Sequence, residues 1–185
     1  KKVGIASSSS EGLVALADFN TRPILRIGER AEMLPGMVAT QHSGEGKANQ
    51  YFLRGMNLDH GTDFSMWVEG MPINLRAHAH GQGYLDLNFI IPELVESARY
   101  SKGPYKASNG DFSSAGNSSI SLYDSIPQPL ISVTLGTEQY RRLLAAGSAD
   151  LASGKMLSAI EILKDDGPWV TSGNIDKLNR SSKYS

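Results

Sequence analysis

The stretch Trp67-Val68-Glu69-Gly70-Met71-Pro72 joins the end of a strand pattern to a turn. Just before the turn, residues 64–69 place Phe64, Met66 and Val68 in alternation with Ser65, Trp67 and Glu69. Because neighbouring side chains of a strand point to opposite faces, this alternation predicts a strand with one buried face. Gly70 and Pro72 are typical turn residues. The stretch therefore predicts a strand followed by a chain reversal.

Short helix and strand signals lie on both sides of this turn. Ile27, Ala31 and Leu34 have helical spacing, and Pro35-Gly36 ends that pattern. Strands are predicted at Met37–Thr40, Gln50–Arg54, Glu96–Lys102 and Ile120–Tyr123, a brief helix at Pro92–Val95, and loops at Gly55–Asp63, 74–86 and Ser108–Ser119. This mixture of short elements predicts the α+β class.

Pro127-Gln128-Pro129 is the best candidate for a domain boundary, because two prolines interrupt a strand ladder. Beyond it, strands are predicted at Leu130–Gly136, Tyr140–Gly147 and Lys155–Leu163, and a further strand could begin within Lys177–Ser185. Arg141-Arg142 and Glu161 interrupt a clean apolar stripe on these strands. We therefore divide the chain into a loosely ordered, Ser-rich lead-in at 1–21, a domain at 22–126 and a strand region at 127–185.

The whole-chain composition excludes several function classes. Eighteen Lys and Arg against nineteen Asp and Glu give a net charge of −1, so nucleic acid is not an expected partner. The absence of Cys excludes disulfides and thiolate metal sites. No run approaches the roughly 20 apolar residues of a membrane-spanning helix, whereas spanning strands alternate and leave hydropathy low. The N-terminal residues are polar too soon for a signal peptide, so any export signal is expected to be absent from this sequence.

Five segments, taken in order, resemble the plug domain of TonB-dependent outer-membrane receptors. They are Leu34-Pro35-Gly36, Tyr51-Phe52-Leu53-Arg54-Gly55, Trp67-Val68-Glu69-Gly70-Met71-Pro72, Ile91-Pro92-Glu93 and Lys102-Gly103-Pro104. One departure is Glu69, which stands where the family usually has Asp. The stretches 41–44, 57–63 and 80–84 look like one bacterial subgroup of the family, and they do not name a substrate.

The resemblance implies a small mixed-sheet plug with short helices, seated inside a β-barrel in the outer membrane. Such a receptor binds a scarce nutrient, a small molecule or metal chelate, and imports it with energy supplied through its partner TonB. Only 60 residues follow Ser125, and spanning strands take about 9 to 11 residues each. The resemblance therefore implies a plug followed by a few antiparallel strands of an incomplete β-barrel. The segment that recruits TonB would precede the plug, and nothing before Glu11 matches it.

Histidines provide the sharpest chemical hypothesis. In an extended segment His78 and His80 point to one face and could share a metal ion, with His60, Asp59 or Asp63 completing the ligand shell. Imidazole and carboxylate ligands favour zinc, copper or nickel over calcium. The alternative is that these histidines are solvated or bind an organic ligand. As members of long loops, the candidate ligand-binding residues are His60, Asp63, His78, His80, Gln82 and Tyr84.

Other conspicuous residues favour structural roles. Arg54 precedes Gly55 at a strand end, where a guanidinium can bind backbone carbonyls or a carboxylate such as Glu69. The pairs Glu69-Gly70 and Gly103-Pro104 are turn signals.

The sequence contains no recognisable catalytic motif. The serine pairs at 113–114 and 118–119 lack the context of a nucleophile, and Gly44-x-Gly46-Lys47 is too short for a phosphate loop. We therefore expect no catalytic residues and no enzyme. Three functions stay open at this point: a transport gate, a soluble metal-dependent enzyme using His60, His78 and His80, and a freestanding binding module.

Overall fold

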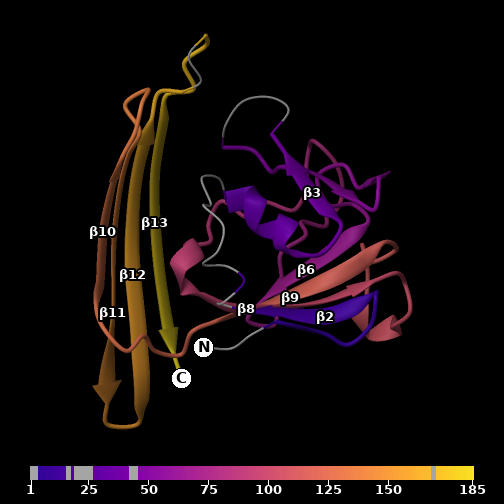
Figure 1. Cartoon of the computed structure of the whole chain (residues 1–185), viewed down its shortest axis with the longest axis horizontal. Coiled ribbons are helices and arrows are strands. Elements are labelled where there is room, and N and C mark those ends of the chain that lie inside the picture. Colours follow the sequence, from indigo (N-terminus) through magenta and orange to yellow (C-terminus); the bar gives the residue numbers. More distant parts are fainter. Residues whose placement is uncertain (1–3, 16–17, 19–26, 42–45, 168–169) are drawn as a thin grey trace. The chain divides into compact units, whose positions relative to one another are not determined.

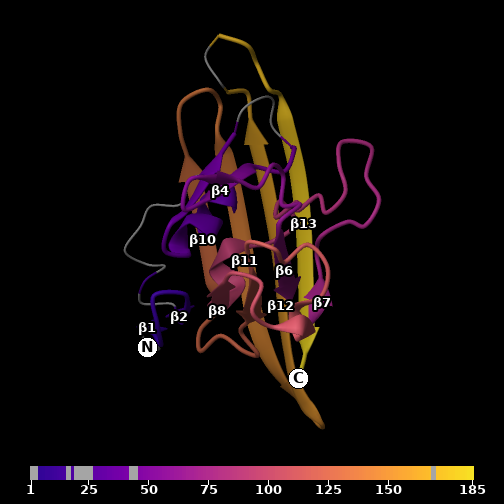
Figure 2. The ribbon, with the colours of Figure 1, turned by 90° about the vertical axis from the view of Figure 1, so that its right-hand side faces the viewer.

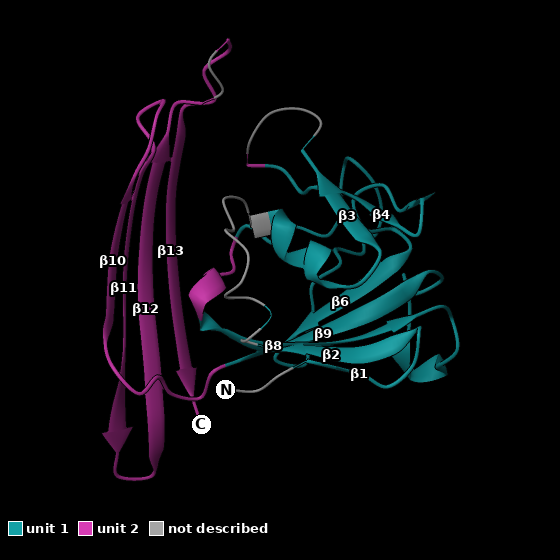
Figure 3. Cartoon of the chain, viewed as in Figure 1, with its two compact units in different colours: residues 1–43, 47–88, 94–122 teal, residues 44–46, 89–93, 123–185 magenta. Residues whose placement is uncertain are grey.

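The computed structural model describes residues 4–15, 18, 27–41, 46–167 and 170–185. The chain forms two compact units (Figure 3): the first comprises residues 1–43, 47–88 and 94–122, and the second comprises 44–46, 89–93 and 123–185. Among the helices in these residues, none has the length and apolar character needed to cross a membrane.

The first unit is built on a six-stranded mixed sheet (Figure 1). Its strands follow the order β1 (Ile5–Ala6), β2 (Glu11–Ala15), β8 (Val95–Lys102), β9 (Gly116–Leu122), β6 (Phe64–Val68) and β7 (Met71–Pro72). The β6–β9 pair is parallel and the other pairs are antiparallel. A second sheet contains β3 (Met37–Thr40), β4 (Gln50–Leu53) and β5 (Met56–Asn57), and the short helices η1 (Ile27–Met33) and η3 (Ala107–Asn109) are 3-10 helices.

Two hairpin turns in this unit have the same backbone conformation. Arg54 and Gly55 have φ values of 53° and 83° between β4 and β5, and Glu69 and Gly70 have φ values of 50° and 77° between β6 and β7. Positive φ at both central residues matches the twist of two-residue hairpins, and glycine at the second position adopts it without steric cost. The chain reversal predicted after Val68 is therefore confirmed.

The core of the first unit contains the buried face of β6, at Phe64, Met66 and Val68. Tyr51 is also fully buried, and its hydroxyl donates to the carbonyl of Leu85 at 3.3 Å. Burial raises the pKa of Tyr51 above its ordinary value, so the phenol stays neutral. Each large apolar side chain buried in this way stabilises the fold by about 1.5–3 kcal/mol.

The second unit contains an antiparallel four-stranded sheet (Figure 2). Its strands, in sheet order, are β10 (Leu130–Leu135), β11 (Arg141–Leu151), β12 (Gly154–Asp165) and β13 (Ile175–Tyr184). Residues 89–93 also belong to this unit and include the first residues of the 3-10 helix η2 (Pro92–Leu94). The expected order of a mixed-sheet region followed by a few antiparallel strands is confirmed.

One face of this sheet carries an exposed apolar row. Val133 pairs with Leu143, Leu143 with Ile162, and Ile162 with Leu178, so four apolar side chains align across the four strands. All four are exposed. The neighbouring positions Leu144 and Glu161 are buried, as the alternation of strand side chains requires. Arg142 and Glu161 therefore do not interrupt the apolar row, and the sequence-based interpretation was wrong for these two residues. Arg141, which it also named, is exposed on the same face as Leu143.

Several predicted elements need correction. The lead-in predicted to be loosely ordered contains β1 and β2, and the predicted loop 55–63 contains β5. The strand predicted to begin at Ile120 begins at Gly116, because Asn117, Ser118 and Ser119 pair with both β6 and β8. Residues 1–3, 16–17 and 19–21 of the predicted lead-in, and residues 42–44 of the stretch 41–44, lie outside the described residues.

Candidate ligand-binding loops and histidine cluster

The loop between Leu75 and Tyr84 is closed at its base by backbone pairing. The N–H of Leu75 donates to the carbonyl of Tyr84 at 3.0 Å, and the N–H of Gly83 donates to the carbonyl of Leu75 at 2.8 Å. The hydroxyl of Thr62 also donates to the carbonyl of Gln82 at 2.9 Å. These bonds join loop 75–84 to loop 56–63, so the two loops that carry the candidate ligand-binding residues form one surface element.

Asn74 fixes the start of this loop. Its side-chain oxygen accepts the N–H of Met66 at 2.7 Å, and its Nδ2 lies 3.0 Å from the carbonyl oxygens of Gly61, Phe64 and Gly83. Sequence reasoning missed this residue. The available signal was a lone amide placed between the apolar residues Ile73 and Leu75.

Asp59, His60 and His80 form a cluster with the composition of a metal site. One ligand atom from each lies within 4.8 Å of the others. The rings of His60 and His80 meet edge to face, with centroids 4.4 Å apart and an interplanar angle of 84°. His60 is 3% exposed, whereas Asp59 and His80 are exposed. The cluster therefore combines one buried imidazole with two exposed side chains.

The environment of His60 selects its tautomer. Its Nδ1 lies 3.0 Å from the carbonyl oxygens of both Ala48 and Asn49. Because carbonyl oxygens only accept hydrogen bonds, Nδ1 carries the proton and the neutral ring has its lone pair on Nε2. That Nε2 lies 3.8 Å from Oδ1 of Asp59.

His78 has a different environment from His60 and His80. Its ring stacks on Tyr84, with centroids 3.9 Å apart and planes inclined by 15°. Its Nδ1 accepts the N–H of His80 at 3.2 Å. Of the other predicted ligand-binding residues, Asp63 accepts a hydrogen bond from the hydroxyl of Ser114, and Gln82 is exposed. Two of the three histidines proposed as metal ligands are thus brought together with Asp59.

The residues expected to be structural have identifiable partners. Nη2 of Arg54 donates to the carbonyl of Ser9 at 2.9 Å, and Oε1 of Glu69 accepts the N–H of Leu122 at 2.5 Å. Gly103, which precedes Pro104, has a φ of 100°, and a Cβ there would meet the Tyr105 ring at 2.4 Å. The geometry at Gly103 therefore requires glycine.

Lys102 lies beside this turn and is largely buried. Its Nζ donates to the carbonyl of Pro35 at 2.9 Å. Burial lowers the pKa of Lys102, and the nearby charge of Arg54 lowers it further. A buried lysine of this kind favours a structural role over contact with a soluble ligand.

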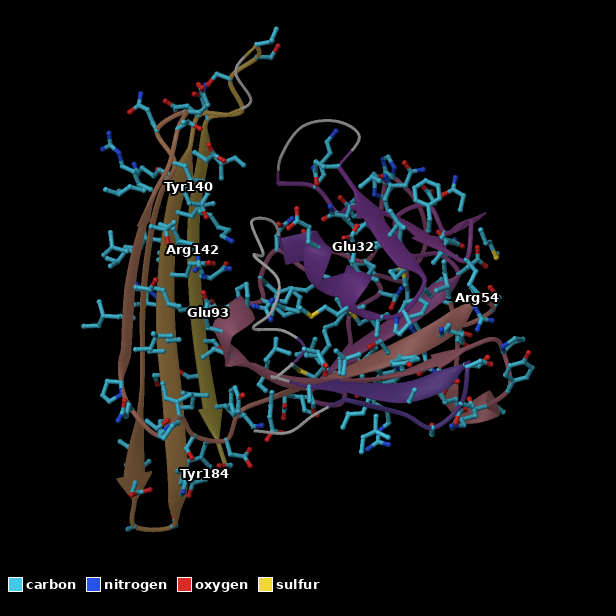
Figure 4. The ribbon with its side chains drawn as sticks, viewed as in Figure 1. Glu32, Arg54, Glu93, Tyr140, Arg142 and Tyr184 are labelled. Carbon is cyan, nitrogen blue, oxygen red and sulfur yellow. The ribbon has the colours of Figure 1, made fainter. Side chains whose placement is uncertain are left out.

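A charged network occupies the second unit and was missed by the sequence analysis as a functional element. Arg142 binds Glu93 through two bonds of 2.6 and 2.8 Å (Figure 4), and its Nε donates to Glu161 at 2.6 Å. Glu161 also contacts Nζ of Lys177 and Nδ2 of Asn179, each at 3.0 Å. The strand register places Arg142 and Glu161 on the face opposite the exposed apolar row. The available sequence signal was the presence of charged residues within apolar strand patterns.

The fold resembles that of solved uptake receptors and a copper transporter. A ferric enterobactin receptor, PfeA, is 18% identical over 86% of this chain and 25% of that chain, with a TM-score of 0.62. The copper transporter OprC is 16% identical over 98% of this chain and 28% of that chain, with a TM-score of 0.68. The ferric yersiniabactin uptake receptor FyuA from Yersinia pestis is 18% identical over 94% of this chain and 27% of that chain, with a TM-score of 0.63. The chain thus spans about a quarter of the length of these proteins.

These similarities define the class as a plug domain followed by part of a barrel. The profile of the TonB-dependent Receptor Plug Domain family matches residues 5–117, which is more than half of the chain. The chain belongs to the TonB-dependent receptor plug-domain family. This is a family of transport receptors, so the soluble-enzyme and freestanding-module alternatives are not favoured.

Proposed function

We propose that this chain is the plug and the first barrel strands of an outer-membrane receptor that imports a scarce nutrient with energy supplied through TonB. The match to the plug-domain family over residues 5–117 carries this proposal. The plug occludes the barrel and rearranges when TonB acts on it from the periplasmic side. The chain by itself does not transport, because the complete barrel supplies the membrane passage.

The strand unit supports a location in the outer membrane. Spanning strands direct apolar side chains to lipid and polar ones to the lumen. The exposed row of Val133, Leu143, Ile162 and Leu178 provides a lipid-facing surface. The opposite face carries the network around Glu161, as expected of a surface directed to the lumen.

We further propose that loops 56–63 and 75–84 meet the transported ligand. Loops held by a rigid sheet commonly carry binding residues. His78, His80 and Gln82 are exposed on loop 75–84, while His60 and Tyr84 form its buried support. Asp63, on the neighbouring loop 56–63, is the remaining candidate ligand-binding residue. The ligand is a small molecule or a metal chelate.

A loop replacement in the intact receptor tests this function. Residues 76–82 would be replaced by a Gly and Ser linker of equal length, which keeps the Leu75–Tyr84 pair that closes the loop. Uptake of ferric enterobactin, ferric yersiniabactin and copper would be compared in competitive growth. Loss of uptake of one of these supports recognition by the loop.

The matched control replaces residues 137–139 at the β10–β11 hairpin tip, where uptake should be retained. If replacement of 76–82 leaves uptake of every nutrient that the wild-type receptor transports unchanged, recognition lies in the remaining barrel loops. If the intact wild-type receptor transports none of the nutrients supplied, with or without TonB, the transport function itself is contradicted.

A further inference from the structure

The cluster of Asp59, His60 and His80 offers two imidazole nitrogens and one carboxylate oxygen within 4.8 Å of one another. Around zinc, with ligand distances of about 2.0–2.1 Å, tetrahedral donors lie about 3.3 Å apart. Since the donors lie within 4.8 Å of one another, coordination requires them to approach by up to about 1.5 Å, and Asp59 and His80 are the exposed members of the cluster. The geometry is therefore compatible with coordination.

The support around His60 is that of a metal ligand. Metal-binding histidines almost always donate their second ring N–H to a carbonyl or carboxylate, which orients the ring. Nδ1 of His60 makes this contact with the carbonyls of Ala48 and Asn49, both at 3.0 Å. The neutral ring consequently presents its Nε2 lone pair on the side of Asp59. These contacts of Nδ1 are an observation separate from the proximity of Asp59, His60 and His80.

A second layer of contacts holds the loop of His80 against His60. The hydroxyl oxygen of Tyr84 accepts the N–H of Ala48 at 2.8 Å, and the carbonyl of Ala48 binds Nδ1 of His60. His78 stacks on Tyr84, and its Nδ1 accepts the N–H of His80. His78 is thus a positioning residue, which acts on the cluster through the backbone of His80.

The donor set restricts the metal. Calcium and magnesium prefer oxygen ligands, whereas imidazole suits zinc, copper, iron and nickel. Divalent affinities at such a site rise to a maximum at copper and fall again at zinc. Three protein ligands leave positions for water or for an external chelator.

We propose that Asp59, His60 and His80 form a binding site for a late first-row divalent cation, with copper(II) bound more tightly than zinc. His60 and His80 contribute nitrogen and Asp59 contributes oxygen. The site goes beyond the proposed transport function, because the purified chain binds the ion without a barrel, a chelator or TonB. A failure of metal binding is therefore distinguishable from a failure of uptake.

Titration calorimetry of the full 185-residue chain with copper(II) and zinc salts tests the site. We expect one tight ion per chain. His80→Ala and Asp59→Asn, both at exposed positions, should weaken copper binding. For His80→Ala we expect a loss of at least about 100-fold, because loss of a residue that only supports a metal ligand costs about 100-fold at most. The matched control His78→Phe keeps an aromatic ring on Tyr84 and should weaken binding by about tenfold at most.

Electron paramagnetic resonance of the copper-loaded chain provides a readout that does not depend on affinity. Wild type and His78→Phe should show coupling to two imidazole nitrogens, and His80→Ala to one. Circular dichroism would establish that each variant is folded. The proposal is overturned if wild type binds neither metal at neutral pH, if His80→Ala leaves affinity and nitrogen coupling unchanged, or if His78→Phe removes a nitrogen while His80→Ala does not.

Discussion

The side-chain oxygen of Asn74 accepts the backbone N–H of Met66 at 2.7 Å, while its amide nitrogen lies 3.0 Å from three carbonyl oxygens. Asn74 is 9% exposed, so these groups have little access to water. The amide joins strand β6 to both ends of loop 75–84. A single buried side chain thus connects the stability of the plug to the shape of its candidate ligand-binding loop.

Asn74→Asp should destabilise the first unit by about 3 kcal/mol or more. The new carboxylate still accepts the N–H of Met66, but it faces the carbonyls of Gly61, Phe64 and Gly83 without a donor. Urea denaturation followed by circular dichroism measures the change. The control is Asn57→Asp, because the exposed Asn57 oxygen only accepts hydrogen bonds, from Asp59 and Gln50, and the cost there should stay within about 0.5 kcal/mol. Equal costs at both positions would contradict the role of Asn74.

The sequence predicted the strands that are marked by a pattern in adjacent residues. It did not predict a strand that depends on pairing with strands distant in the sequence. Met37–Thr40 and the hairpin after Val68 were predicted because alternation and turn glycines lie in adjacent residues. Gly116–Ser119 was predicted to be a loop from its polar composition. It forms a strand because the parallel partner β6 and the antiparallel partner β8 satisfy its backbone, and the small side chain of Ser118 is buried on one face of the sheet.

At the candidate site, too, the sequence revealed local features and did not reveal contacts between distant residues. The sequence showed that His60, Asp59 and His80 lie in two loops. It did not show that these three, among all the candidate metal ligands, would lie close together. A spacing of two residues places side chains on one face only in an extended segment, and the chain bends on both sides of His78. That bend lets His78 accept the N–H of His80 and stack on Tyr84. The metal role of these residues remains a prediction.

Gly70→Ala should destabilise the first unit by about 1–2 kcal/mol. Gly70 has a φ of 77°, a conformation that costs an L-residue about that much, and a Cβ there would contact nothing within 4 Å. The cost is therefore conformational and not steric. Gly81→Ala is the control, because Gly81 has no such φ and its nearest contact would be Asp59 at 3.9 Å, so the change should be neutral or slightly stabilising. Chemical denaturation compares the two, and a neutral Gly70→Ala would refute the argument.

The ion pair of Glu11 and Lys106 predicts a pH dependence of stability. Its 2.9 Å hydrogen bond, and then the charge of Lys106, lower the pKa of Glu11. A carboxyl group with a lowered folded-state pKa contributes stability above its unfolded pKa of about 4.3, and the contribution is lost as pH falls through the folded value. Lys106→Gln should therefore lower the urea midpoint at pH 7, and its difference from wild type should shrink on acidification. Glu11→Gln should behave alike, and a difference that does not vary with pH would exclude this linkage.

Arg142→Met should destabilise the second unit by about 1–3 kcal/mol, because Glu161, which is 1% exposed, loses its 2.6 Å partner and keeps only Lys177 and Asn179, each at 3.0 Å. Glu161→Met alone should also be costly, since it removes the carboxylate that Arg142 Nε and Lys177 both contact, although Arg142 keeps its two bonds to Glu93. The double variant removes both charges and should cost clearly less than the sum of the two single changes. Urea denaturation of the chain in detergent, followed by circular dichroism, provides the three values.

The same sheet offers a matched control for this cycle. Lys164 and Asp176 form a 3.0 Å pair whose side chains are 62% and 68% exposed. Because solvent screens such a pair, Lys164→Met should change stability by less than about 1 kcal/mol and should show little coupling to Asp176→Asn. If Arg142→Met costs no more than Lys164→Met, Lys177 or water compensates the charge of Glu161. In that case the network does not order the strand unit, and the buried face of β11 and β12 depends on Leu144 and Leu157 for its stability.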